Sequence, residues 1–213
     1  MHLPPNDGGS FELTPAGAHP AICYRFIDLG TQQSNYMGQP KVRHEILISW
    51  EIADAEIKMT DGKPFAIGRI YTWSMNEKSS LRKDLESWRG KPFTDADFGD
   101  KGFDTKTIVG VPCLVNVTHS EKQNGGGMRD NVAGIMRLPK GMTCAPLVNP
   151  TVYLALTPDR FDREAFSKLS ENLQNKIKAS PEYQALVNPA PAERIVDEGY
   201  EQMNGFEPDP VPF

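Results

Sequence analysis

The chain has 213 residues, 38% of them hydrophobic and 24% charged, and its 23 Lys+Arg against 28 Asp+Glu give a net charge of −5. This composition suits one domain with a real core. No stretch approaches the roughly 18–20 apolar residues of a membrane span, and the opening residues lack the basic start and apolar run of a signal peptide. Three cysteines without a CxxC pair exclude a disulfide scaffold and a four-cysteine zinc module. We therefore expect a cytoplasmic protein.

The charge is unevenly distributed along the chain. From Glu182 to Phe213 there are seven acidic residues and one base, Arg194, for a net charge of −6, whereas residues 1–181 sum to +1. This last segment is also rich in proline and has no apolar repeat. It cannot bury enough surface to offset the entropy lost on ordering. We therefore predict that residues 184–213 form a disordered acidic tail.

The first half of the chain reads mainly as strands. Residues 20–29 are rich in β-branched and aromatic side chains and predict a strand, and residues 31–40 follow as a polar turn. Residues 41–53 predict a second, long strand whose alternate positions form one apolar face. A DGKP turn at 61–64 leads into a third strand at 65–74.

A helix and two further strands are predicted next. In 77–88, Leu81, Leu85 and Trp88 recur at helical spacing, and Gly90 is a stop signal. Asn76 or Ser74 is the expected N-cap.

The remaining elements complete the pattern. Residues 107–118 and 130–138 read as strands on either side of a glycine-rich tip at 124–127. Residues 151–157 predict a short strand, and 161–183 predict one helix or two.

The predicted order of strand, strand, strand, helix, strand, strand is that of the OB-fold. This fold is mainly β: a five-stranded, partly open Greek-key barrel, here with the helix between strands 3 and 4. Another small β-barrel or mixed sheet with one crossover helix is the alternative. We assign residues 1–157 to an OB-fold domain, 158–183 to a helical extension and 184–213 to the tail.

Enzyme motifs are scarce in this sequence. It lacks GxxxxGK[ST], GxGxxG, HExxH and GxSxG, so nothing predicts a phosphate loop, a zinc site or a nucleophile elbow. We expect no enzyme activity, no cofactor and no metal. Asp95, Asp97 and Asp104 keep a small metal-dependent hydrolase or nuclease as an alternative, although a solvated loop explains these acids better.

The third predicted strand carries a pattern typical of single-stranded nucleic acid binding. Arg69, Tyr71 and Trp73 alternate on one face, where a cation can contact phosphate and a ring can stack on a base. Each such stack is worth roughly 1–3 kcal/mol. A core role for Trp73 is equally compatible with the sequence, and for Trp50 and Trp88 a core role is favoured.

Further candidate contacts come from the strand ends and loops. Lys41 and Arg43 open the second predicted strand, and Lys122 and Arg129 flank the glycine-rich tip. Tyr36 lies in the turn after the first strand. In OB-folds, strands 2 and 3 and the loops beside them form the binding surface. A plain solvated hairpin is the alternative for Lys122 and Arg129.

The last residues, EPDPVPF, resemble the tails of bacterial single-stranded DNA-binding proteins, which end in acidic residues followed by Ile-Pro-Phe or a near variant. The resemblance implies a docking tip for replication and repair proteins. Phe213 would be the apolar anchor and Asp209, Val211 and Pro212 would complete the tip, with the acids steering the encounter. The acidic run here is sparser than in the bacterial tails.

The body also resembles a known family. The stretches DGKPFAIGRIYT (61–72), YTWSMNEKSSLRKDLESWRGKPFT (71–94) and VGVPCLVNVTH (109–119) look like bacteriophage proteins that bind single-stranded DNA or act in replication. The likeness spans roughly residues 15–183 and transfers no binding residue.

Together these features predict a phage protein that coats and protects single-stranded DNA during replication, recombination or repair, and recruits partners through its tip. It would act in the host cytoplasm, as a monomer or a homo-oligomer and without a membrane. The alternative is a protein-interaction adaptor, or an inhibitor of a host replication enzyme, that does not bind DNA.

Overall fold

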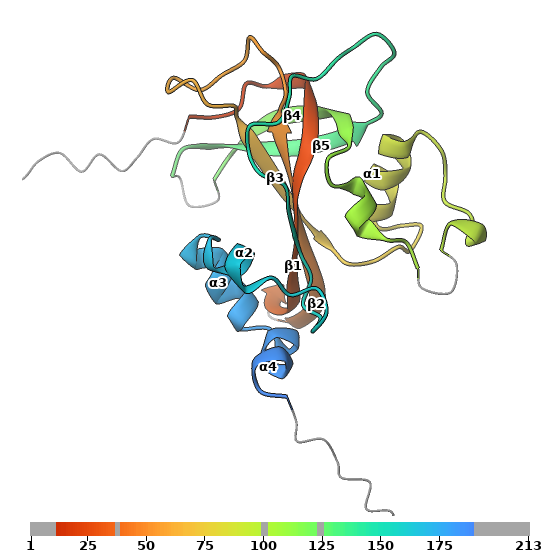
Figure 1. Ribbon diagram of the computed structural model, residues 1–213, viewed down its shortest axis with the longest axis vertical. Coiled ribbons are helices and arrows are strands. Elements are labelled where there is room, and N and C mark those ends of the chain that lie inside the picture. Colours follow the sequence, from red (N-terminus) through yellow and green to blue (C-terminus); the bar gives the residue numbers. More distant parts are fainter. Residues whose placement is uncertain (1–11, 37–38, 99–101, 123–125, 190–213) are drawn as a thin grey trace, which may run out of the picture.

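Figure 1 shows the computed structural model of the protein, which describes residues 12–36, 39–98, 102–122 and 126–189. The strands are β1 (Gly17–Tyr36), β2 (Gln39–Ile52), β3 (Ala66–Thr72), β4 (Pro112–Glu121), β5 (Met128–Met136) and β6 (Val152–Leu154). The helices are α1 (Ser80–Arg89), the 3₁₀ turns η1 (Asp95–Asp97) and η2 (Thr105–Ile108), α2 (Arg163–Ser167), α3 (Glu171–Lys178) and α4 (Pro181–Val187).

The strands form one six-stranded sheet in the order β3-β2-β1-β4-β5, with β6 added in parallel to β1. All other pairings are antiparallel. The two end strands, β3 and β5, approach each other to within 8 Å between Cα atoms, so the sheet curves back on itself. The predicted mainly β class is confirmed. No helix of the described ranges is long and apolar enough to cross a membrane.

Strand β1 contributes to two apolar clusters, and β-bulges set which of its side chains face each one. Its register with β2 shifts between Cys23 and Arg25, and again between Asp28 and Gly30. A one-residue shift moves the following side chains to the opposite face. Cys23 and Phe26 accordingly both belong to the main core although they are three positions apart, and Ile27 belongs to a second cluster.

The main core lies between the sheet and α1 (Figure 1). Helix α1 begins after Ser79, whose side chain accepts a hydrogen bond from the backbone N–H of Arg82, so the expected caps Asn76 and Ser74 are wrong. The helix ends at Gly90 in the left-handed region, as predicted. Its apolar stripe of Leu81, Leu85 and Trp88 is buried.

The core roles predicted for two tryptophans are confirmed. Trp50 and Trp88 are both buried, with their ring centroids 6.2 Å apart in an edge-to-face arrangement. Such pairs add to the stabilisation that burial alone provides.

Three predicted element boundaries are wrong. The polar segment 31–40, expected as a turn, continues β1 to Tyr36 and starts β2 at Gln39, so the two strands form a long ribbon. Strand β4 begins at Pro112 rather than at residue 107, because η2 occupies the preceding residues and proline fits the first position of a strand. The predicted single or double helix over 161–183 is three short helices, and α4 continues to Val187.

The helices α2 to α4 cover the second cluster, on the other side of β1 and β2 from α1 (Figure 1). Ile27, Leu29 and Leu154 of the sheet pack there against Phe166 and Ile177 of the helices. The residues predicted as the helical extension therefore belong to the folded body. The predicted start of the disordered tail at residue 184 is wrong, because residues 184–187 belong to α4, and residues 190–213 of that tail lie outside the described residues.

Gly30 sets how closely α4 approaches the sheet. It has a φ of 70°, and a Cβ built on it would lie 2.4 Å from the Ser180 Oγ and 2.8 Å from a Glu182 carboxylate oxygen. Ser180 caps α4 and is fully buried. Only glycine combines this backbone conformation with this contact.

We predict that Gly30→Ala undocks α4 and destabilises the protein. Gly62→Ala is the matched control, because Gly62 has a similar φ of 80° but nothing within 4 Å of the added Cβ. The control should lose about 1–2 kcal/mol from backbone strain alone. Gly30→Ala should lose a further ~1–3 kcal/mol from overpacking. Urea unfolding measures both, and equal losses would contradict this account.

Candidate nucleic-acid interface

Trp73 follows β3 and, at 44%, is the only exposed Phe, Tyr or Trp side chain among the described residues. Its backbone N–H donates to the His44 carbonyl at 2.7 Å, which extends the β2–β3 ladder by one residue. The ring centroid lies 5.9 Å from that of Phe26 in an edge-to-face contact and 5.8 Å from that of His44. Side chains of β1 and β2 thus support an indole that remains accessible to a ligand.

A hollow of about 350 Å³ opens beside Trp73. It lies between the end of β3, the start of α1 and the segment before β4. Its lining is mainly apolar and aromatic and consists of Trp73, Ser74, Met75, Leu81, Phe98, Gly102, Phe103 and Thr105. A flat ring stacked on Trp73 would contact further aromatic side chains there.

Arg69 and Tyr71 are not available for the role that the alternation suggested. Tyr71 is 2% exposed and lies in the main core, so its predicted stacking on a base is wrong. Asp84 of α1 accepts hydrogen bonds from the Tyr71 hydroxyl and from Arg69 Nη1, both at 2.8 Å. Burial is the main cause that raises the pKa of Tyr71, and the Asp84 charge adds to it. The face carrying Arg69 and Tyr71 therefore fastens β3 to α1.

The remaining basic residues predicted to contact DNA lie on two separate hairpins. Arg43 is exposed in β2, and Lys41 is exposed two residues earlier. Lys122 and Arg129 are exposed on the β4–β5 hairpin, which pairs with the first residues of β1, whereas the β1–β2 ribbon closes at the other end of β1. Tyr36 is the last residue of β1, and its side chain lies outside the described set, as do the predicted tip residues.

Three surface residues were missed by the sequence analysis. Arg25 stacks its guanidinium 5.0 Å from the Tyr24 ring centroid, and its Nε is buried without a hydrogen-bond partner in the described structure. Val42 is 61% and Ile70 47% exposed. The bulge beside Tyr24 determines the face on which Arg25 lies. Alternation read from the sequence does not reveal such a bulge.

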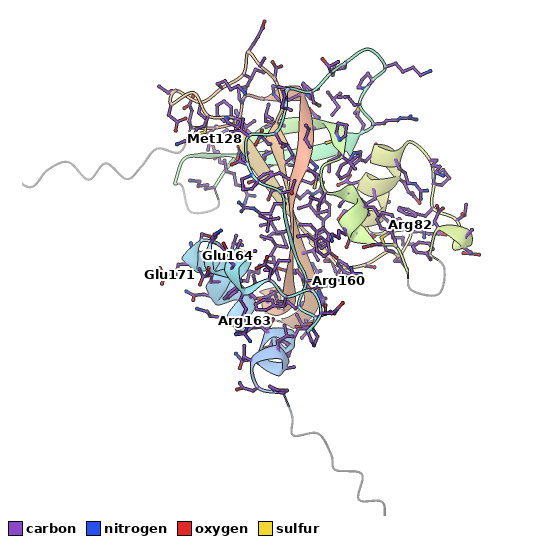
Figure 2. All side chains as sticks on the ribbon, in the orientation of Figure 1. Arg82, Met128, Arg160, Arg163, Glu164 and Glu171 are labelled. Atoms are coloured by element: carbon purple, nitrogen blue, oxygen red, sulfur yellow. The ribbon has the colours of Figure 1, made fainter. Side chains whose placement is uncertain are left out.

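Figure 2 shows the side chains that crowd the long β1–β2 ribbon, with Arg160 close to it. Tyr153 connects this arginine to the aromatic cluster, because it hydrogen-bonds to Arg160 and stacks on Phe26 with ring centroids 5.3 Å apart. The Arg160 guanidinium also lies 3.5 Å from Asp104. The charge of Arg160 near the aromatic cluster is therefore partly neutralised.

The three acids considered for a hydrolase have structural partners or lie apart. Asp97 accepts from Arg89 at 2.6 Å and from Thr94, and these bonds hold the pKa of its carboxyl well below the usual range. Asp104 caps η2, and Asp95 is exposed in η1. Within the described residues, no three His, Cys, Asp or Glu side chains are grouped to hold a metal ion.

His44 connects the Trp73 region to the C-terminal helices. Its Nε2 lies 2.6 Å from Asp28 Oδ1 and its Nδ1 3.5 Å from Glu182 Oε1 of α4. The hydrogen bond to Asp28 raises the pKa of His44, against the effect of burial. Burial pushes the pKa of Glu182 upward, but hydrogen bonds from the Thr31 side chain and backbone outweigh it and the pKa is lowered. The contacts of His44 therefore join β1, β2 and α4, and protonation of its ring would strengthen them.

Comparison of the sequence with protein-family models and with curated proteins finds no match. The function is therefore argued from the geometry of the chain itself.

We predict that stability falls as the pH rises through the pKa of His44. Because this pKa is raised on folding, its contribution is complete below the unfolded value of about 6.5 and is lost as pH rises through the folded value. His44→Gln should flatten the dependence of the urea midpoint on pH above about 6.5. His119→Gln is the control, since that ring contacts the neutral Thr14 carbonyl, and it should keep the dependence. An unchanged slope in His44→Gln would contradict the prediction.

Proposed function

We propose that the protein is an OB-fold protein that binds single-stranded DNA. The strand order carries the proposal: β1 pairs with both β2 and β4, the end strands β3 and β5 approach each other, and α1 connects β3 to β4. This order supports the five-stranded Greek-key barrel, a fold that binds oligonucleotides with strands 2 and 3 and the neighbouring loops. β6 and α2 to α4 would be additions to it.

Trp73 is the residue on which we expect a base to stack. It is exposed at the end of β3, is supported by Phe26 and His44, and borders an aromatic hollow. Stacking tolerates every base because each has a π-face. The exposed basic side chains of the two hairpins would contact phosphates, and this part of the affinity would fall with salt. The body has a net charge of only +1, so local contacts and stacking must supply the affinity.

The biological role that we propose is protection of single-stranded DNA during phage replication or recombination. The C-terminal tip, Asp209 and Val211–Phe213, would dock on partner proteins through its terminal aromatic anchor and its acids. These contacts depend on residues outside the described set, so the sequence alone supports this part of the proposal.

Titration with oligo-dT should quench the tryptophan fluorescence. Trp73 is the most exposed of the three tryptophans, so Trp73→Ala should remove most of the change. Trp73→Ala should weaken binding roughly 5- to 150-fold, the equivalent of one base stack. Ile70→Ala is the control, because Ile70 is similarly exposed two positions before the end of the same strand. No binding at low salt would reject DNA binding and favour the adaptor function.

The salt dependence tests the hairpin contacts. Among the described residues, Arg43 has no carboxylate within ion-pair distance. Arg43→Ala should therefore reduce the slope of log K against log salt by about 0.7, the value expected for one lost phosphate contact on a single strand. Lys83→Ala, at an exposed position of α1, should leave the slope unchanged. A slope unaffected by Arg43→Ala would remove this residue from the interface.

A further inference from the structure

A second and larger cleft lies near the C-terminal end of α1. It has a volume of about 710 Å³ and is formed by the end of α1, by η2, by the start of β4 and by the residues that follow β5. It is separate from the hollow beside Trp73, although Phe103 lines both. Ligand pockets in proteins usually have volumes of this order and a mostly apolar lining with a few polar groups.

The charged lining of this cleft has one sign. Arg89, Lys91 and Arg137 line it, and no carboxylate is among its lining residues in the described structure. Lys91 and Arg137 are exposed. Arg89 donates from Nη2 to Asp97 at 2.6 Å, but its Nη1 is buried and has no hydrogen-bond partner in the described part of the chain. Such a buried donor is costly when it has no acceptor. An anion that reached this nitrogen would supply one.

The cationic groups lie beside fixed aromatic rings. Trp88 Nε1 donates to the Pro112 carbonyl at 2.9 Å, which fixes the indole. The Arg89 guanidinium lies over the Phe93 ring at 4.3 Å. Phe93 and Phe103 meet edge to face with centroids 5.1 Å apart. The cleft thus combines a rigid aromatic wall with cations.

Gly90 lets one of these cations approach. A Cβ at this position would lie 3.2 Å from Arg137 Cδ, so the missing side chain leaves room for the arginine across the end of α1. The Arg137 backbone N–H donates to the Ser87 carbonyl at 3.1 Å and fixes the residue against the helix. The position of Arg137 is therefore built into the fold.

These features favour a compact ligand over an extended peptide. The Arg137 N–H and the Pro112 carbonyl are already hydrogen-bonded to Ser87 and Trp88, so these two groups are less available to an added strand. A flat ring with an attached anion matches both the aromatic wall and the cations. We propose that the cleft binds a nucleotide, with its phosphate at Arg89, Lys91 and Arg137 and its base against the aromatic side chains. The site is independent of strand binding at Trp73.

Calorimetric titration of the full chain with dTMP tests the proposal. We expect dTMP to bind at least about tenfold more tightly than thymidine or inorganic phosphate, because each of these lacks one of the two recognised parts. Equal binding of phosphate or of thymidine would overturn it. Binding of a synthetic FEPDPVPF peptide without binding of dTMP would also overturn it, and would assign the cleft to an acidic peptide.

Variants place the binding in this cleft. Arg137→Glu and Lys91→Glu should each weaken dTMP binding about tenfold or more. Lys83→Glu should not weaken dTMP binding, because Lys83 is exposed on α1 and does not line the cleft. Trp73→Ala should leave dTMP binding unchanged while it weakens oligo-dT binding, so the two sites can fail separately. Loss of dTMP binding in Trp73→Ala, or its survival in both charge-reversal variants, would overturn the assignment.

Discussion

The bulged strand β1 is the constraint on which the rest of the structure depends. It pairs with β2 along its length, with β4 near its start and with β6 near its middle, so every other strand is placed directly or indirectly through it. The shift beside Tyr24 moves the following side chains to the opposite faces. Cys23 and Phe26 can therefore both face the main core, while Ile27 faces the cluster under the C-terminal helices. Without this shift, Phe26 and Ile27 would exchange faces.

Polar contacts then hold two further segments, the residues before β6 and helix α4, against the sheet. Glu51 is a buried carboxylate of β2 that accepts hydrogen bonds from the backbone of Val148 and from the backbone and side chain of Asn149. These bonds hold the segment that leads into β6 across the sheet. At the other end of β2, His44 and Glu182 hold α4 against the ribbon. The accessible position of Trp73 depends on this second group, because its ring rests on His44.

Much of the fold could be predicted from the sequence, whereas the site could be predicted only in part. The periodicity of β2 and of α1 is strong, since Ile46, Ile48 and Trp50 alternate and Leu81, Leu85 and Trp88 recur at helical spacing. The same alternation grouped Tyr71 with Trp73, because a strand pattern gives the face and not the point at which the core ends. Tyr71 lies beneath α1 and Trp73 lies beyond it. The bulge that orients Arg25 has no signal in the sequence, and the cationic cleft is formed by segments that lie far apart in the chain.

The distribution of charge limits how the protein can recognise an anion. With a body near neutrality, long-range attraction is weak and cannot by itself select nucleic acid. Many of the basic side chains also already form ion pairs, among them Arg69 with Asp84, Arg82 with Glu86 and Lys176 with Glu45. Such pairs stabilise the fold and add little to the external field. Recognition must then come from the few places where cations lie beside aromatic rings without competing carboxylates. The cleft at the end of α1 meets this condition with Lys91 and Arg137, beside an Arg89 that is already paired with Asp97, and Trp73 contributes mainly through its exposed ring.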